Sequence, residues 1–193
     1  IDGSYHGAVI DYLPAEGKEP GWPRLADMDG RLALHRVDLR LFAERATMLP
    51  QPGLPIELKG IEARIANLER DSVLEVQGHT AAKADAYLAL VRHSPLGKML
   101  DGLLDEARAT GEWEVPLAMS LPLVDGRDGA VKGEVRFSGG EFQPMPEMPA
   151  FRRLSGALAF TETDIQAADL KGEFLGGPVA VGGGVGGGAK GLA

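Results

Sequence analysis

The sequence contains no cysteine, which excludes disulfide bonds, thiolate catalysis and cysteine-ligated metal or iron–sulfur sites. Basic residues are also scarce, since 20 Lys and Arg stand against 28 Asp and Glu and give a net charge of −8. Nucleic-acid phosphates and anionic membrane surfaces both require a basic face, so we expect neither as a partner. The uninterrupted apolar runs are only a few residues long, which predicts no transmembrane helix in this chain.

Patterns that carry catalysis are missing as well. The histidines do not stand at metal-ligand spacing from one another, and no G-x-S-x-G sequence is present. A glycine-rich match to the dinucleotide fingerprint begins at Gly182, but too few residues follow it for the helix that such a site needs. We therefore expect no metal, no cofactor and no enzymatic activity, with a hydrolase or sugar-binding enzyme on a β-scaffold as a minor alternative.

Apolar and polar residues alternate with a period of two along much of the chain, which indicates strands with one apolar face. In the longest run the apolar parity carries Trp113, Val115, Leu117, Met119, Leu121 and Leu123. Pro116 and Pro122 lie on the other parity and lack an N–H group, so we expect this strand to lie at an edge or to contain bulges. The apolar parity changes at His35–Arg36 and at Gly60, which predicts bulges or tight turns there.

One segment follows the helical period instead. Leu96, Met99, Leu100, Leu103, Leu104 and Ala107 recur at the spacing of one helix face. Ser94 before Pro95 is typical of a helix start, and a shorter helix is predicted over residues 83–91. We therefore predict one β-rich domain over residues 1–181 with a helical insert at about 83–109, followed by a flexible glycine-rich tail over 182–193.

Two stretches of the sequence are similar to each other. The pattern P-x-[LF]-x-x-[ML]-x-G-x-L-A-[LF] begins at Pro23 and again at Pro149, a spacing of 126 residues. Asp38 and Asp164 continue the match at the same spacing. We interpret the similarity as a repeated strand unit of a modular sheet, with chance similarity as the alternative.

Strands with one apolar face need something to cover that face. A second sheet, a closed barrel, the helix or a bound apolar ligand would each suffice, and each buried Leu, Val or Met contributes roughly 1.5–3 kcal/mol. The residues on the expected inward parity are Leu32, Leu34, Val37, Leu39, Leu41, Trp113, Val115, Leu117, Met119, Leu121, Val135, Phe137, Leu158 and Phe160. The helix stripe Leu96, Met99, Leu100, Leu103 and Leu104 is expected to cap or line the same surface.

Four short motifs, in order, resemble a known family. They are Trp22-Pro23-Arg24-Leu25 running to Asp29-Gly30-Arg31-Leu32, Ser94-Pro95-Leu96, Leu121-Pro122-Leu123, and Leu175-Gly176-Gly177-Pro178. Together they resemble the YhdP branch of the AsmA-like family over residues 3–181. The resemblance implies a long curved antiparallel sheet, mainly β with one or two helices, that forms an open hydrophobic groove. After Val181 glycines replace the next expected strand.

The same resemblance implies a function. Members of the family are large envelope proteins of Gram-negative bacteria with an inner-membrane anchor and a periplasmic body for phospholipid transport. We expect this chain to be an internal, periplasmic segment without the anchor, whose partners are phospholipid acyl chains and neighbouring segments of the same polypeptide. A structural or assembly β-sandwich that docks other envelope proteins is the alternative.

Overall fold

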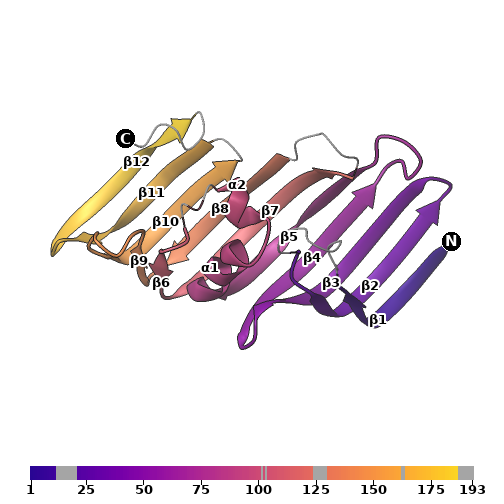
Figure 1. Cartoon of the computed structure of the whole chain (residues 1–193), viewed down its shortest axis with the longest axis horizontal. Coiled ribbons are helices and arrows are strands. Elements are labelled where there is room, and N and C mark those ends of the chain that lie inside the picture. Colours follow the sequence, from indigo (N-terminus) through magenta and orange to yellow (C-terminus); the bar gives the residue numbers. More distant parts are fainter. Residues whose placement is uncertain (12–20, 101, 103, 124–129, 162–163, 187–193) are drawn as a thin grey trace.

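The structure is a computed structural model, and it describes residues 1–11, 21–100, 102, 104–123, 130–161 and 164–186. Its strands form one open antiparallel sheet in the order β1-β2-β3-β4-β5-β7-β8-β10-β11-β12, with the short β6 and β9 at one side (Figure 1). The strands are β1 (Asp2–Ile10), β2 (Leu25–His35), β3 (Asp38–Gln51), β4 (Leu54–Ile65), β5 (Val73–Lys83), β6 (Arg108–Ala109), β7 (Glu112–Pro122), β8 (Ala130–Ser138), β9 (Glu141–Gln143), β10 (Phe151–Thr161), β11 (Asp164–Phe174) and β12 (Gly177–Gly186).

The sequence prediction of a mainly antiparallel, open β-sheet is therefore confirmed. The parity change at His35–Arg36 is a tight turn between β2 and β3, with Arg36 at φ 56°. The change at Gly60 is a bulge, because the register between β4 and β5 shifts between Lys59 and Glu62. These irregularities keep apolar residues on one face along the whole of each strand.

The expected edge position of the proline-containing strand is wrong. β7 lies inside the sheet between β5 and β8, and its register with β5 is continuous from Glu112 to Pro122. On the β8 side the paired positions pass from Glu114 directly to Leu117. Pro116, which has no N–H to donate, lies in this interval, so the sheet accepts the proline with a local interruption of one ladder.

The internal repeat is a repeated hairpin. Leu32 pairs with Leu41 in β2–β3, and Leu158 pairs with Ala167 in β10–β11, at the same offset of 126 residues. Asp27 and Arg153 also share the offset, and both adopt positive φ, at 52° and 51°. The two hairpins therefore have the same register and the same local bend, which agrees with a repeated unit rather than chance similarity.

Two helices follow β5. The first, α1 (Ala84–Arg92), was predicted to within a residue or two, whereas α2 (Leu96–Met99) is only four residues long. The expected helix through Ala107 is wrong, because Gly102 adopts φ 72° and the Arg92 guanidinium donates to the carbonyls of Leu104 and Ala107. The insert then ends in β6 rather than in a helix.

The last strand enters the segment that we assigned to a flexible tail. β12 continues to Gly186, and residues 183–186 pair with β11 instead of leaving the sheet. Glycine permits this strand but adds little side-chain packing. The rest of the expected tail, residues 187–193, lies outside the described residues.

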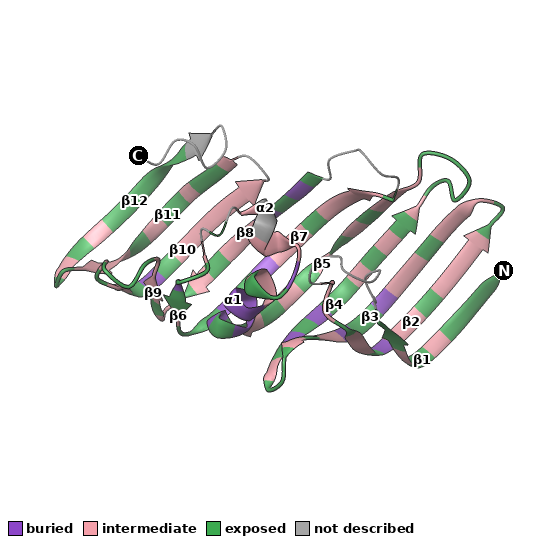
Figure 2. Cartoon of the chain, in the orientation of Figure 1, coloured by how far each residue is buried: buried purple, intermediate pink, exposed green. Residues whose placement is uncertain are grey.

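The core lies at one end of one sheet face, under α1. This helix packs against β3, β4, β5 and β6, and Ala84, Ala86, Tyr87, Leu88 and Ala89 of the helix are buried. Figure 2 shows buried residues concentrated in α1 and in the strand ends beneath it. We call the sheet face that carries α1 the inner face, and the opposite one the outer face.

Candidate functional site

Apolar side chains run across the inner face in cross-strand rows. Directly opposed residues of an antiparallel pair share a face, so the successive pairings trace each row from strand to strand. One row consists of Leu32, Leu41, Ala63, Val76, Met119 and Val131. The next consists of Leu34, Leu39, Ile65, Leu74 and Leu121. Both rows lie on the parity of the core residue Val115, and they extend the apolar surface beyond the core.

The closed half of the inner face is the part that α1 covers. Trp113 and Val115 of β7 are each 7% exposed there. The Tyr87 ring of α1 stacks on Trp113 with centroids 6.1 Å apart. The Tyr87 hydroxyl lies 2.8 Å from Thr80 Oγ1, and the Thr80 hydroxyl in turn donates to the Val115 carbonyl. Burial raises the pKa of Tyr87 to about 12, so the tyrosine is neutral and satisfied in this sealed core.

A third row separates the closed half from the rest of the face, and we call it the boundary row. It consists of Gly30, Ala43, Ile61, Gly78, Leu117 and Gly133. Large neighbours fill the space over its glycines. A Cβ on Gly78 would lie 2.6 Å from Ile61 Cδ1, and a Cβ on Gly133 would lie 2.5 Å from Phe160 Cζ. The boundary row is therefore a continuous apolar band.

The open half of the inner face lies beyond the boundary row and comprises the Leu32 and Leu34 rows. Except for buried Val131, the side chains of these rows are half-exposed. Exposure rises toward the strand ends, where Leu123 is 53% and Leu68 is 43% exposed. We call this outer limit, at Val37, Leu68 and Leu123, the rim. Its segments are joined by backbone hydrogen bonds, from Leu68 N to the Val37 carbonyl and from Leu123 N to the Ser72 carbonyl.

The residues predicted from the inward parity divide between the two halves. Those that the pairings place in the open half or the boundary row are Leu32, Leu34, Leu39, Leu41, Leu117, Met119 and Leu121; Val37 lies at the rim. Trp113 and Val115 belong to the closed half, and Phe137 packs edge-on against Trp113 with centroids 5.3 Å apart. Val135 and Leu158 pair with each other across β8 and β10, and Phe160 covers Gly133.

The helix stripe did not form as one surface. Leu96, Leu100 and Leu104 are half-buried, but of these three only Leu96 lies in a helix. That helix, α2, packs chiefly on α1. The Ser94 hydroxyl accepts from Leu96 N at 3.3 Å, so the predicted helix start is confirmed. The Met99 side chain and Leu103 lie outside the described residues.

Sequence reasoning missed several members of the open half. Ala63, Ile65, Leu74 and Val76 belong to the same rows as the predicted leucines. Their strands are visible from the alternation, but each apolar run is short. Only the register, which places Ile65 between Leu39 and Leu74, assigns these residues to a continuous surface.

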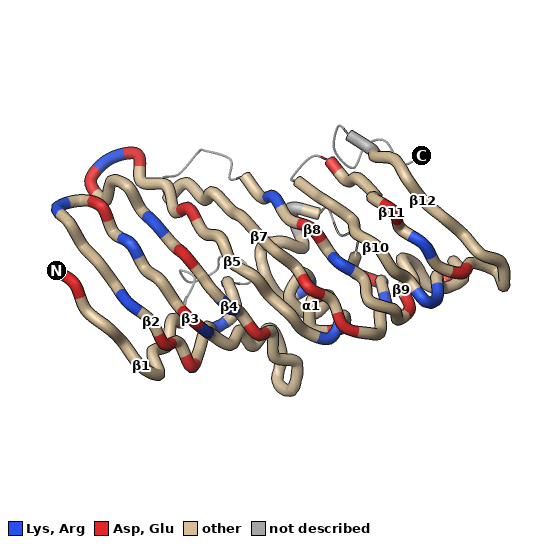
Figure 3. The backbone as a smooth tube through the Cα atoms, turned by 180° about the vertical axis from the view of Figure 1, so that it is seen from behind, with Lys and Arg blue, Asp and Glu red and all other residues tan. Residues whose placement is uncertain are grey.

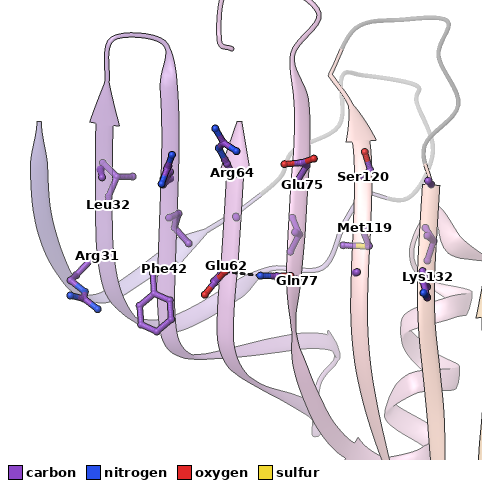
Figure 4. Close-up of a pocket in the computed structure, with 18 of the residues that line it drawn as sticks. Arg31, Leu32, Phe42, Glu62, Arg64, Glu75, Gln77, Met119, Ser120 and Lys132 are labelled. Atoms are coloured by element: carbon purple, nitrogen blue, oxygen red, sulfur yellow. Dashed lines mark hydrogen bonds between the residues drawn. The ribbon is translucent and has the colours of Figure 1, made fainter. Parts of the chain in front are cut away.

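The outer face carries a trough with a volume of about 1220 Å³ across β1 to β8 (Figure 4). Its lining residues include two polar rows on either side of the Leu32 row, such as Arg31 and Glu62 in one and Arg64 and Glu75 in the other. Because neighbouring positions of a strand face opposite sides, these rows contribute side chains on the outer face. The backbone of Leu32, Leu41 and Met119, whose side chains are on the inner face, forms the floor between them.

Charged residues occur along many strands of the sheet (Figure 3), and several of their side chains pair with one another on the outer face. Asp38 accepts from Arg64 at 2.7 Å and from Arg40 at 3.1 Å, and these guanidinium groups hold the pKa of the Asp38 carboxyl far below its usual range. Gln77 donates to Glu62 at 2.6 Å, as Figure 4 marks. The outer face is therefore a hydrated ion-pair surface, in contrast to the inner face.

Two kinds of functional feature are missing from the described part of the chain. It holds no cluster of three or more His, Asp or Glu side chains that could bind a metal ion. None of its helices has the length and apolar character needed to cross a bilayer.

One family model matches the chain. It is described as YhdP protein and covers residues 6–187, which is nearly the whole sequence and includes the second half of β1 and every later strand of the main sheet. No curated protein and no solved structure gives a significant match.

Proposed function

The chain belongs to the YhdP protein family, and from that premise we propose that it is a non-enzymatic segment of a lipid-transfer protein. In this proposal the open half shields phospholipid acyl chains from water. We place the segment in the periplasm, as part of an inner-membrane-anchored protein that bridges the inner and outer membranes.

The observation that carries the proposal is the half-exposed apolar surface beyond α1, which none of the described helices and strands covers. Two rows of mostly half-exposed aliphatic side chains cross the sheet there, from Leu34 on β2 to Leu121 on β7. Each acyl CH₂ moved from water onto such a surface contributes about 0.8 kcal/mol. Shielding by apolar contact needs no catalytic group and no polar recognition along the tail.

The dimensions support the same role. Ten strands follow one another along the main sheet, and at about 4.8 Å per step they extend over roughly 43 Å. One hydrocarbon leaflet is about 15 Å thick, so a lipid tail fits on this surface. An envelope is wider than this segment, and the described edge strands β1 and β12 each pair on one side only. We propose that neighbouring segments of the same polypeptide continue the sheet at these edges.

The proposal is tested by photo-crosslinking to lipid from a photoreactive amino acid at Leu41. Met119→Asp places a carboxylate on the open half and is expected to abolish the crosslink while leaving the sheet folded. The matched control is Ala118→Asp, one residue away on the opposite face, which should leave the crosslink intact. Leu117→Asp provides a second variant in the boundary row. Undiminished crosslinking in both inner-face variants refutes a lipid role for the open half.

A docking role is the second candidate, and the outer trough is the observation that favours it. The described strands form one sheet, so the expected β-sandwich is wrong, but the trough could still receive an envelope protein through its paired charges. Native mass spectrometry after size exclusion separates the two functions. Co-purified phospholipid supports the lipid surface, whereas a stable, lipid-free complex with a protein supports docking.

A further inference from the structure

The open half ends at the same cross-strand row on β3 and on β7. Along the inner face of β7, Trp113 and Val115 are buried, Leu117 is half-buried, and Leu123 is exposed. On β3 the change falls between buried Ala43 and half-exposed Leu41, and Ala43 and Leu117 both belong to the boundary row. On both strands this limit borders the part of the sheet that α1 covers, which indicates that α1 determines the depth of the open surface between β3 and β7.

That depth is close to the length of a lipid tail. Leu117 to Leu123 on the β7 side and Ala43 to Val37 on the β3 side each cover six residue steps, or about 20 Å. The hydrocarbon of one leaflet is about 15 Å thick in a fluid bilayer. An extended acyl chain can therefore lie along the strands between the boundary row and the rim.

The α1 end of this surface is sealed. Tyr87 is fixed by its contacts to Thr80 and Trp113. Ile61 fills the space over Gly78 and Phe160 fills the space over Gly133, so the boundary row leaves no gap at these two glycines. A tail that reaches this end meets packed protein rather than a passage.

The rim offers the opposite environment. Arg36, Glu69 and Arg70 are exposed in the two segments that the Leu68–Val37 hydrogen bond joins. Charged groups in water suit a phospholipid headgroup, whereas burial of that headgroup near α1 would leave its charges unsolvated. The two ends of the open half therefore favour one orientation of a lipid.

We propose that α1 is an end-stop for acyl chains, so that the tail lies along the strands with its methyl end against the boundary row and its headgroup at the rim. This inference rests on the proposed lipid-shielding function and adds a selection by chain length. Longer tails would have to leave the apolar surface at the rim and lose about 0.8 kcal/mol for each CH₂ so exposed. In this proposal Leu117, at the boundary, and Met119, one pleat nearer the rim, limit the length of the acyl chain that the surface accepts.

The test moves the stop toward the rim. Met119→Trp fills the surface one pleat, about 6.6 Å, closer to the rim, and Ala63→Trp does so from β4 in the same row. Binding of a homologous series of saturated phosphatidylethanolamines is measured by native mass spectrometry, with circular dichroism to confirm the fold. Both variants should prefer shorter chains than the unaltered protein. Ala118→Trp, on the outer face, is the matched control and should keep the original preference.

The outcomes separate the two proposals. A shift to shorter chains in both inner-face variants, with no shift in Ala118→Trp, supports the end-stop. Lipid binding with unchanged length preference in both variants overturns the end-stop and leaves the lipid function standing. If the unaltered protein binds no member of the series, the lipid function itself fails and the end-stop fails with it.

Discussion

The closed and open halves of the inner face are built from the same strands and the same residue types, yet they differ in what covers them. Val115 and Met119 lie two pleats apart on β7, one buried under α1 and the other half-exposed. The apolar parity is uniform across this distance. The difference shows that hydrophobic alternation creates an apolar sheet face, whereas the nine-residue helix α1 determines which part of that face is buried as core.

The largest expected effect is in the closed half. Trp113→Ala removes the ring that stacks on Tyr87 and meets Phe137, and it should lower the free energy of unfolding by about 3–5 kcal/mol. Met119→Ala in the open half should lower it by about 1 kcal/mol or less. Urea denaturation monitored by far-UV circular dichroism, a signal that does not depend on Trp113, measures both losses of stability. Equal losses would contradict the division of the face.

The next effect is at the boundary row. A Cβ on Gly30 would collide with the Phe42 carbonyl oxygen and lie 2.6 Å from the Tyr5 hydroxyl. Gly30→Ala should therefore cost about 1–3 kcal/mol, with Gly3→Ala as the control, since Gly3 has open space around its Cβ position. Thermal unfolding of the two variants should show a drop for Gly30→Ala alone; a similar drop for both would mean that close packing is not the cause.

A smaller effect is expected from the Tyr87 hydroxyl. Tyr87→Phe keeps the stacked ring but removes the contact to Thr80, which is worth about 0.5–1.5 kcal/mol. Because burial raises the pKa of Tyr87 in the folded state from its ordinary value of 10.0 to about 12, its contribution is complete below pH 10 and is lost as the pH rises toward 12. Urea midpoints over this range should fall less steeply in Tyr87→Phe; parallel curves would argue against a buried neutral tyrosine.

The smallest effect is expected on the outer face. Arg64 and Arg40 lower the pKa of Asp38, so its stabilisation is present above the ordinary aspartate pKa and is lost as the pH falls below it. The groups are exposed to solvent, and salt screens such pairs. Asp38→Asn should slightly flatten the acid limb of the stability curve at low salt and change nothing at high salt. A change that persists at high salt would mean that the pair is not a surface pair.

Much of the fold was readable from the sequence because period-two alternation and turn residues are local signals. The repeat at Pro23 and Pro149 predicted a shared unit, and the common register of β2–β3 and β10–β11 confirms it. The helix expected through Ala107 failed for a tertiary reason. Ala107 is fully buried and its carbonyl accepts from Arg92, so packing against α1 replaced the helical hydrogen bonds that the spacing indicated.

The candidate site was readable only in part. The leucines of β2, β3 and β7 were found because their strands are long, whereas Ile65 and Leu74 are joined to them only by cross-strand pairing. The position of α1 over Thr80 and Trp113 was not predictable from its own sequence. A helix stripe states that one face is apolar but not which part of a sheet it covers.

The sequence by itself determined that these strands would present one apolar and one charged face, because side chains alternate along a pleated backbone. It also determined where the chain turns, because glycine and bulge positions act locally. Only the tertiary structure decided that the apolar face is buried under α1 at one end and half-exposed at the other. That division depends on contacts between residues far apart in the chain, and no local pattern encodes which distant surface a helix will bury.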